Sequence, residues 1–221
     1  MLIACWSPKG GSGTTVVTAA LSLVLAETRG PTLLVDLAGD IPAALGLPEP
    51  DGPGLSEWLG AGADVPSDAL SRLEVDAAPG VRLLAQGSNP DAMITSPGGG
   101  ERTAALLGAL AVERRPVVAD CGRADNGVGL AVAAGATLSL LVLRPCYLAL
   151  RRALAAPLRA SGVILVGEEG RSLGRRDVEE VLGIPVRAEV GFDPAVARAV
   201  DAGLLSRRVP RALERSLRRA A

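Results

Sequence analysis

Short runs of apolar residues recur along the chain, and each is bounded by glycine, proline or charged residues. Runs of this length and setting are typical of strands that are buried on both faces of a sheet. We predict such strands at Leu2–Trp6, Thr32–Val35, Val81–Leu84, Pro116–Ala119, Leu138–Leu143, Val163–Val166 and Pro185–Val190.

Segments with helical spacing fill most of the intervals between these runs. Parallel strands need a crossover connection, usually a helix, so the alternation predicts an α/β fold, a three-layer sandwich with a mostly parallel central sheet. The apolar stretch Val128–Leu143 is interrupted by small residues and is interpreted as a helix followed by a strand, not as a membrane span. The other predicted helices are Thr15–Glu27, Thr103–Glu113, Leu148–Ser161 and Arg175–Leu182.

Two stretches interrupt this alternation. Residues 47–71 are rich in proline and glycine, which predicts an irregular excursion with one short helix, and residues 86–100 form a second loop. Neither is long or polar enough to be a linker between domains. Because 221 residues with 48% hydrophobic content suffice for one substantial core, we expect a single domain spanning residues 1–221.

Composition excludes several function classes. A formal net charge of −1 provides no overall attraction to nucleic acid or an anionic membrane, and 2% aromatic residues are too few for a base-stacking platform. Cys5, Cys121 and Cys146 are widely separated in a chain without histidine, which favours buried core residues over a disulfide or zinc site. The first residues lack the basic region of a signal peptide, so we expect a cytoplasmic protein.

A glycine-rich stretch lies between the first strand and the first helix, where a phosphate-binding loop would lie. Glycine lets the backbone fold its N–H groups around an anion, and the positive end of the helix points at the same place. Thr15 stands where a Walker A loop carries the hydroxyl that binds magnesium. The stretch reads Ser7-Pro8-Lys9-Gly10-Gly11-Ser12-Gly13-Thr14-Thr15.

The stretch Lys9–Thr15 resembles the deviant Walker A motif, KGGxGK[ST], of ParA/MinD-like P-loop ATPases of the SIMIBI class, and the resemblance covers nearly the whole chain. Thr14 departs from the motif, because relatives carry the P-loop lysine there. The signature lysine is kept as Lys9, which the resemblance implies reaches across a homodimer to the partner's phosphates. It also implies ATP or ADP with Mg²⁺ as cofactors, bound by Gly10, Gly11, Ser12, Gly13, Thr14 and Thr15.

Lys9 is the only lysine of the chain. A compact ammonium fits a glycine loop better than a planar guanidinium does, which favours a catalytic, phosphate-directed role for Lys9 over that of a solvated loop residue. The missing lysine at Thr14 removes a charge-assisted bond worth about 1.5–3 kcal/mol. This predicts nucleotide affinity about ten- to a hundredfold below that of a full motif, and weak or absent hydrolysis.

Two predicted strands lead into aspartates. The resemblance aligns Asp36 with the first aspartate of the family's DxD element, which supports magnesium in cofactor binding, whereas the second, water-positioning aspartate falls on Ala38. Asp40 lies two residues further on and would take over this catalytic role if the loop bends, although aspartate beside glycine is also an ordinary turn pair. Asp120 follows an apolar strand in the Walker B pattern and is expected to hold magnesium through water.

Arginines follow two later strands and crowd the C-terminal end. For Arg123 and Arg144 we favour surface ion pairs over contact with a phosphate or a partner subunit. Residues 204–221 are expected to form a helix with Leu213 and Leu217 on one side. It would dock on the domain, contact DNA weakly and non-specifically, or, less favoured because its apolar face is thin, contact a membrane. Its arginines are Arg207, Arg208, Arg211, Arg215, Arg218 and Arg219.

These features predict a nucleotide-binding, dimerising switch in intracellular positioning or partitioning, with an unidentified partner protein or cargo. A second interpretation is a pseudo-ATPase scaffold similar to the TadZ/CpaE type, which dimerises and binds partners without nucleotide turnover. A metabolic P-loop enzyme similar to dethiobiotin synthetase is disfavoured, because few polar residues are left for a substrate site. Residues 167–170 lack the asparagine that many relatives use for adenine, so the base preference stays open.

Overall fold

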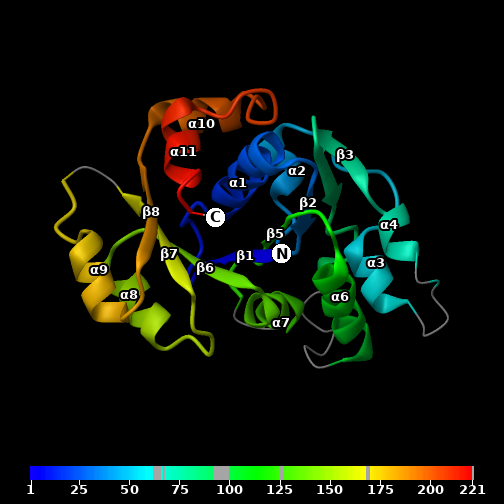
Figure 1. Cartoon of the computed structure of the whole chain (residues 1–221), viewed down its shortest axis with the longest axis horizontal. Helices are drawn as coiled ribbons and strands as arrows, with labels where there is room; N and C mark the ends of the chain where they lie inside the picture. The colour runs from blue at the N-terminus through cyan, green and yellow to red at the C-terminus, as the bar shows by residue number, and fades with distance from the viewer. Residues whose placement is uncertain (62–65, 67, 92–99, 125–126, 168–169, 221) are drawn as a thin grey trace.

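In the described part of the chain, eight strands form one central sheet with helices on both faces (Figure 1). The computed structural model describes residues 1–61, 66, 68–91, 100–124, 127–167 and 170–220. The strand order is β3-β4-β2-β5-β1-β6-β7-β8, and all neighbouring pairs are parallel except β3 and β4 at one edge. The strands are β1 (Leu2–Trp6), β2 (Thr32–Asp36), β3 (Val75–Ala78), β4 (Val81–Leu84), β5 (Val117–Asp120), β6 (Leu138–Leu143), β7 (Gly162–Gly167) and β8 (Val186–Gly191).

The sheet separates two apolar cores because successive side chains of each strand point to opposite faces. In β1, Ile3 and Cys5 join the core beneath α1, whereas Leu2, Ala4 and Trp6 join the core on the other face. The first face carries α1 (Thr14–Arg29), α2 (Ile41–Leu45), α10 (Pro194–Asp201) and α11 (Arg211–Leu217). The second carries α3 (Leu55–Gly60), α4 (Ala69–Arg72), α6 (Glu101–Val112), α7 (Gly127–Gly135), α8 (Tyr147–Leu154) and α9 (Arg175–Leu182).

The predicted α/β class and all predicted strands are confirmed, with three corrections to the elements. Strand β3 was not predicted, because this short edge segment is only partly buried and pairs with β4 through a tight turn. The described part of residues 47–71 contains α3 and most of α4, where one short helix was predicted. Helix α8 ends at Leu154, well before the predicted Ser161, and Pro157 would interrupt its hydrogen-bond ladder. Of the predicted loop at 86–100, residues 92–99 lie outside the described part.

The C-terminal helix is shorter than expected and packs on the first helix. Helix α11 spans only Arg211–Leu217, and Leu213 and Leu217 are 1% and 0% exposed in the core beneath α1. Arg218 pairs with Glu214 at 2.6 Å and with Glu27 of α1 at 3.4 Å. The apolar side of this helix is therefore used inside the protein.

An arginine holds two carboxylates together beside β3 and β5. Arg115 contacts Glu74 at 2.7 Å and Glu113 at 2.9 Å. The hydrogen bonds from the Arg115 side chain, aided by backbone N–H groups and the Arg115 charge and opposed by burial, bring the pKa of Glu113 down to about 2. This network ties the edge hairpin to the turn after α6.

The cysteines are unpaired. Cys5 and Cys121 are buried, as predicted, and Cys146 is half-buried. Burial raises the pKa of the Cys5 thiol to about 12, so this side chain stays neutral. Within the described residues, no helix has the length and apolar content needed to cross a membrane.

Candidate functional site: a glycine loop facing buried carboxylates

The loop of residues 7–13 connects β1 to α1 in a conformation that requires glycine. Gly11 and Gly13 have φ of 75° and 84°, in the left-handed region that other residues rarely adopt. A Cβ at either position would meet no atom within 4 Å, so conformation and not space is the constraint. Gly13 precedes α1 without a side-chain cap, and the first turn of α1 carries no acid. The first N–H groups of this helix therefore suit an anion.

Hydrogen bonds fix the loop from within. The hydroxyls of Ser7 and Ser12 both donate to the carbonyl oxygen of Lys9, each at 3.0 Å. The backbone N–H of Ser7 donates to the carbonyl oxygen of Gly122, after β5, at 2.8 Å. The loop is thus held in place before any ligand arrives, which lowers the entropic cost of binding.

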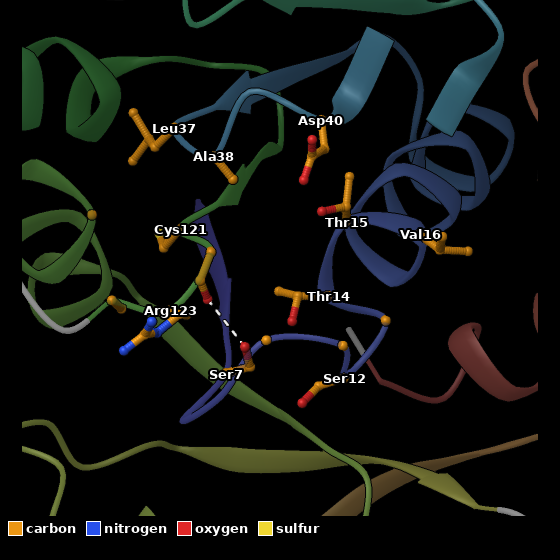
Figure 2. Close-up of a pocket in the computed structure, with 16 residues that line it drawn as sticks. Ser7, Ser12, Thr14, Thr15, Val16, Leu37, Ala38, Asp40, Cys121 and Arg123 are labelled. Carbon is orange, nitrogen blue, oxygen red and sulfur yellow. Dashed lines mark hydrogen bonds between the residues drawn. The ribbon is translucent and has the colours of Figure 1, made fainter. Parts of the chain in front are cut away.

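The loop forms one wall of a cavity of about 520 Å³ (Figure 2). This volume is in the usual range for small-molecule sites. The cavity lies where the adjacent parallel strands β2, β5 and β1 end, the edge of an α/β sheet at which ligands bind. It is lined by Ser7, residues 10–16, Leu37, Ala38, Asp40, Cys121, Gly122, Arg123, Ala124 and Gly129.

Asp120 is fully buried at the end of β5. Its Oδ1 accepts a hydrogen bond from the N–H of Gly122 at 3.0 Å, but its Oδ2 has no hydrogen-bond partner in the described structure. Burial, with a smaller contribution from the Asp40 carboxylate, raises the pKa of Asp120 to about 6. The nearby Thr15 hydroxyl lowers the pKa of Asp120 and so favours the carboxylate form, although it does not form a hydrogen bond to Oδ2. An unpartnered buried oxygen is unfavourable and suits a cation or a water bound to one.

Asp36 lies directly beside Asp120 in the parallel register of β2 and β5. Its Oδ1 accepts from the N–H groups of Ala38 and Gly39 at 3.0 and 2.7 Å, and its Oδ2 from that of Ile41 at 3.0 Å. Burial raises the pKa of Asp36 to about 7 against the opposite effect of these donors. Asp36 lies behind the cavity wall and shapes the loop that carries Asp40, and its predicted contact with the cofactor stays a prediction.

Asp40 is exposed and lines the cavity. Its carboxylate points toward Thr15 (Figure 2), and the catalytic role of Asp40 stays a prediction. Ala38 also lines the cavity and lies close to Gly122. A Cβ added at Gly122 would come within 3.2 Å of the Cβ of Ala38. Among the aspartates predicted for this site, Asp40 alone lines the cavity.

Comparison of the sequence with protein-family models gives no match. Comparison with curated proteins gives none either. Solved structures, in contrast, match over almost the entire chain. A ParA family ATPase from Chlorobium tepidum TLS gives a TM-score of 0.79 at 18% identity, covering 98% of this chain and 95% of that one. MinD from Pyrococcus horikoshii OT3, complexed with Mg-ADP, gives 0.76 at 18% identity, covering 99% and 93%. A Cyanothece McdA variant in complex with ATP gives 0.77 at 17% identity, covering 98% and 93%.

The chain has the ParA/MinD fold. At such low identity the likeness shows the fold, so the chemistry of the site rests on the residues of this chain. One observation shows that the residues of this site fit magnesium: the buried Oδ2 of Asp120, close to Thr15, has no hydrogen-bond partner in the described structure. No group of three or more histidine, cysteine or acidic side chains forms a metal site within the described residues. Phosphate oxygens and water would therefore complete the coordination, as is usual for Mg²⁺.

Two positions set this example of the ParA/MinD fold apart. Thr14 lines the cavity and is 8% exposed, so no P-loop lysine enters there. Lys9 lines a separate hollow of about 160 Å³ together with Arg144 and Arg171, and its Nζ lies 3.5 Å from the carbonyl oxygen of Gly10. The only lysine of the chain thus lies outside the cavity that its own loop forms.

Arg123 lines the cavity beside Gly122 (Figure 2). From the sequence we favoured a surface ion pair over a phosphate contact for this residue, and both roles stay predictions. The available signal was its position three residues after Asp120, in the loop that leaves the carboxyl end of β5.

A second, more apolar hollow of about 240 Å³ adjoins the other side of the glycine loop. It shares residues 11–13 with the cavity and is walled by β7, the loop after β8, and α10. Phe192, Asp193 and Asp201 contribute to this wall. Of the predicted segment 167–170, residues 168 and 169 lie outside the described part. The apolar wall of this second hollow consists of Val16, Val17, Val166, Val190, Phe192, Val196, Ala197, Val200 and Leu213.

Proposed function

We propose that the protein binds ATP with Mg²⁺ and acts as a dimerising nucleotide switch in intracellular positioning or partitioning. The observation that carries the proposal is the buried Oδ2 of Asp120, which has no partner in the described structure and belongs to the carboxylate beneath a preformed glycine loop. The similar structures support it, since one is complexed with Mg-ADP and another with ATP. We place this switch in the cytoplasm.

Each part of the site has a role in this proposal. The loop N–H groups and the start of α1 bind the phosphates, and the apolar hollow beside residues 11–13 receives the base. The Thr15 hydroxyl and, through water, Asp120 hold Mg²⁺, which when bound neutralises phosphate charge. Asp36 accepts hydrogen bonds from the backbone N–H groups of the loop that carries Asp40, and so positions Asp40. Asp40 in turn orients water in the cavity.

Hydrolysis is weak in this proposal because two charges are missing from the cavity. Position 14 carries a hydroxyl in place of an ammonium, which lowers transition-state stabilisation by about 1.5–3 kcal/mol. Position 38 carries a methyl group in place of a carboxylate, so only the exposed Asp40 remains to orient water. We therefore expect the bound state to last, which suits a switch better than a fast enzyme.

Dimerisation is the step that we assign to Lys9. Its side chain lies in the hollow with Arg144 and Arg171, outside the cavity of its own chain. A lysine in this position is available to the phosphates bound by a second copy, as the resemblance implies.

The test is Mg²⁺-dependent ATP binding by calorimetry, combined with size-exclusion chromatography and light scattering. We expect the wild type to bind Mg-ATP and to dimerise with it. Lys9→Ala should lose the dimer, whereas Arg176→Ala, which removes an exposed arginine of α9, should keep it. Absence of Mg-ATP binding by the wild type at millimolar nucleotide would overturn the proposal.

A second candidate is the pseudo-ATPase scaffold. The specific observation in its favour is that Thr14 and Ala38, two uncharged residues, line the cavity at the positions where the resemblance implies a lysine and an aspartate. A scaffold would dimerise and bind its partner protein without nucleotide. The same chromatography separates the two candidates, because a dimer whose population is unchanged by Mg-ATP and by Lys9→Ala supports the scaffold.

The C-terminal arginines complete the proposal as a weak, non-specific DNA contact. Leu213 and Leu217 are buried, so membrane insertion of this face would require α11 to leave the core. Arg211, Arg215 and Arg219 are exposed and remain available to phosphate. DNA binding that weakens steeply with salt, and that Arg215→Ala with Arg219→Ala reduces, would support this contact.

A further inference from the structure

We infer that Arg123 supplies the positive charge that the missing P-loop lysine would otherwise bring to the nucleotide phosphates. The inference rests on the proposed function and names the residue that makes the phosphate site work without a lysine. Arg123 is the only lysine or arginine among the described residues that line the 520 Å³ cavity. Lys9, Arg144 and Arg171 line other hollows.

The backbone around Arg123 is fixed on both sides. The carbonyl oxygen of Gly122 accepts from the N–H of Ser7 at 2.8 Å, and the N–H of Gly122 donates to Asp120 Oδ1 at 3.0 Å. The N–H of Ala124 closes the turn on the carbonyl oxygen of Cys121 at 3.0 Å. Arg123 thus belongs to a turn that is bonded both to the Walker B strand and to the first residue of the glycine loop.

The turn is also strained in the way that functional loops are. Ala124 has a φ of 42° and is the only described residue other than glycine with a positive φ. Gly122, on the other side of Arg123, has a φ of 56°. Two left-handed residues flanking one arginine reverse the chain sharply, and such conformations persist where the surrounding structure enforces them. The reversal makes Arg123 a residue of the cavity lining, and its exposed side chain extends from the turn on the side away from α1 (Figure 2).

The chemistry suits a phosphate chain. A guanidinium presents a planar fork of donors that binds two phosphate oxygens at once, and it keeps its charge at any physiological pH. The other charged residue of the cavity lining is Asp40, a carboxylate, and the buried Asp120 lies in the strand just before the turn. Nucleotide phosphates entering this cavity therefore meet Arg123 as the cation provided by their own chain.

The experiment relocates the charge. Mg-ATP affinity is measured by calorimetry for the wild type, Arg123→Gln, the double variant Thr14→Lys with Arg123→Gln, and Arg176→Gln as a matched exposed control. We expect Arg123→Gln to weaken binding about ten- to a hundredfold, as befits a lost charge-assisted phosphate contact. Thr14→Lys should restore most of it, and Arg176→Gln should leave it unchanged.

Several outcomes would overturn the inference. Arg123→Gln binding within about threefold of the wild type would do so, and so would an equal loss in Arg176→Gln. A loss accompanied by a lower unfolding temperature, and not restored by Thr14→Lys, would make Arg123 a residue that holds the turn. A loss without a change in unfolding temperature supports the inference even if the lysine does not restore binding. If the wild type itself binds no Mg-ATP, the proposed function fails, which is a result distinct from all of these.

Discussion

Replacing Asp120 by asparagine should stabilise the nucleotide-free protein while abolishing its response to magnesium. The side chain is buried, and its Oδ2 lacks a partner in the described structure, so the ionised form is unfavourable. A rise in its pKa from 3.8 to about 6 corresponds to about 3 kcal/mol, since one pKa unit is about 1.4 kcal/mol. The new amide N–H also lacks a partner and costs about 1 kcal/mol. The net gain is therefore about 2 kcal/mol.

The gain should depend on pH with a defined sign. The folded protein holds the Asp120 proton up to about pH 6, whereas the unfolded chain releases it near pH 3.8. Unfolding thus releases protons in this interval, and the free energy of unfolding of the wild type falls as the pH rises through it. Asparagine does not titrate, so the difference between variant and wild type is small at pH 4 and reaches its full size above pH 6.

Thermal unfolding at pH 4.5 and pH 8, with a chelator and then with Mg-ATP, measures both effects. At pH 8 the variant should unfold about 4–8 °C above the wild type without magnesium, given about 2–4 °C per kcal/mol for a chain of this size. Mg-ATP should raise the unfolding temperature of the wild type only. Asp40→Asn, at an exposed carboxylate of the same cavity, should shift the magnesium-free value by less than about 2 °C. A variant less stable than the wild type at pH 8 would refute the reasoning.

Other substitutions test how the site is held in the fold. Leu217→Ala should lower the free energy of unfolding by about 2–5 kcal/mol in denaturant titrations, because the side chain is fully buried beneath α1, whereas exposed Arg219→Ala should change it by less than about 0.5 kcal/mol. Gly46→Ala should destabilise by more than about 3 kcal/mol, since its Cβ would collide with the backbone of Gly203 and its φ of 72° disfavours alanine, and an unchanged unfolding midpoint would contradict this packing. Arg115→Gln should cost about 1–3 kcal/mol at pH 7 by removing the ion-pair partner of Glu113 and one of the two arginines that contact Glu74. This difference should shrink as the pH falls toward 2, where Glu113 begins to bind its proton, and a pH-independent difference would exclude its ion pair as the cause.

The sheet was predictable because its signal is local. Leu2–Trp6 and the other apolar runs are buried on both faces, so each run carries its own evidence for a strand. Strand β3 carries no such signal, since its Val-Asp-Ala-Ala sequence is half exposed and its pairing with β4 depends on the turn between them. The length of α8 was overestimated because alanine and leucine continue the helical pattern past the point at which Pro157 ends it.

The motif of the site was predictable from the sequence, but the directions in which its side chains point were not. The spacing of the glycine loop led to Thr15 and the cavity, and the Walker B pattern led to Asp120. Whether Asp36 would point into the cavity or behind it depends on three backbone N–H groups that only the folded loop presents. The place of Arg123 depends in the same way on the reversal of the chain between Gly122 and Ala124, a conformation that alanine rarely adopts.

The position of Lys9 in its own hollow makes the protein accessible to single-site amine chemistry. Apart from the N-terminal amine, Lys9 carries the only primary amine of the chain, and it is half-buried at the mouth of the glycine loop. An acylating reagent can therefore modify at most two amines of the chain, and peptide mass spectrometry assigns the label to Lys9 without mutagenesis. The rate of that labelling, followed by mass spectrometry with and without Mg-ATP, would report directly on whether the loop is covered by a second molecule.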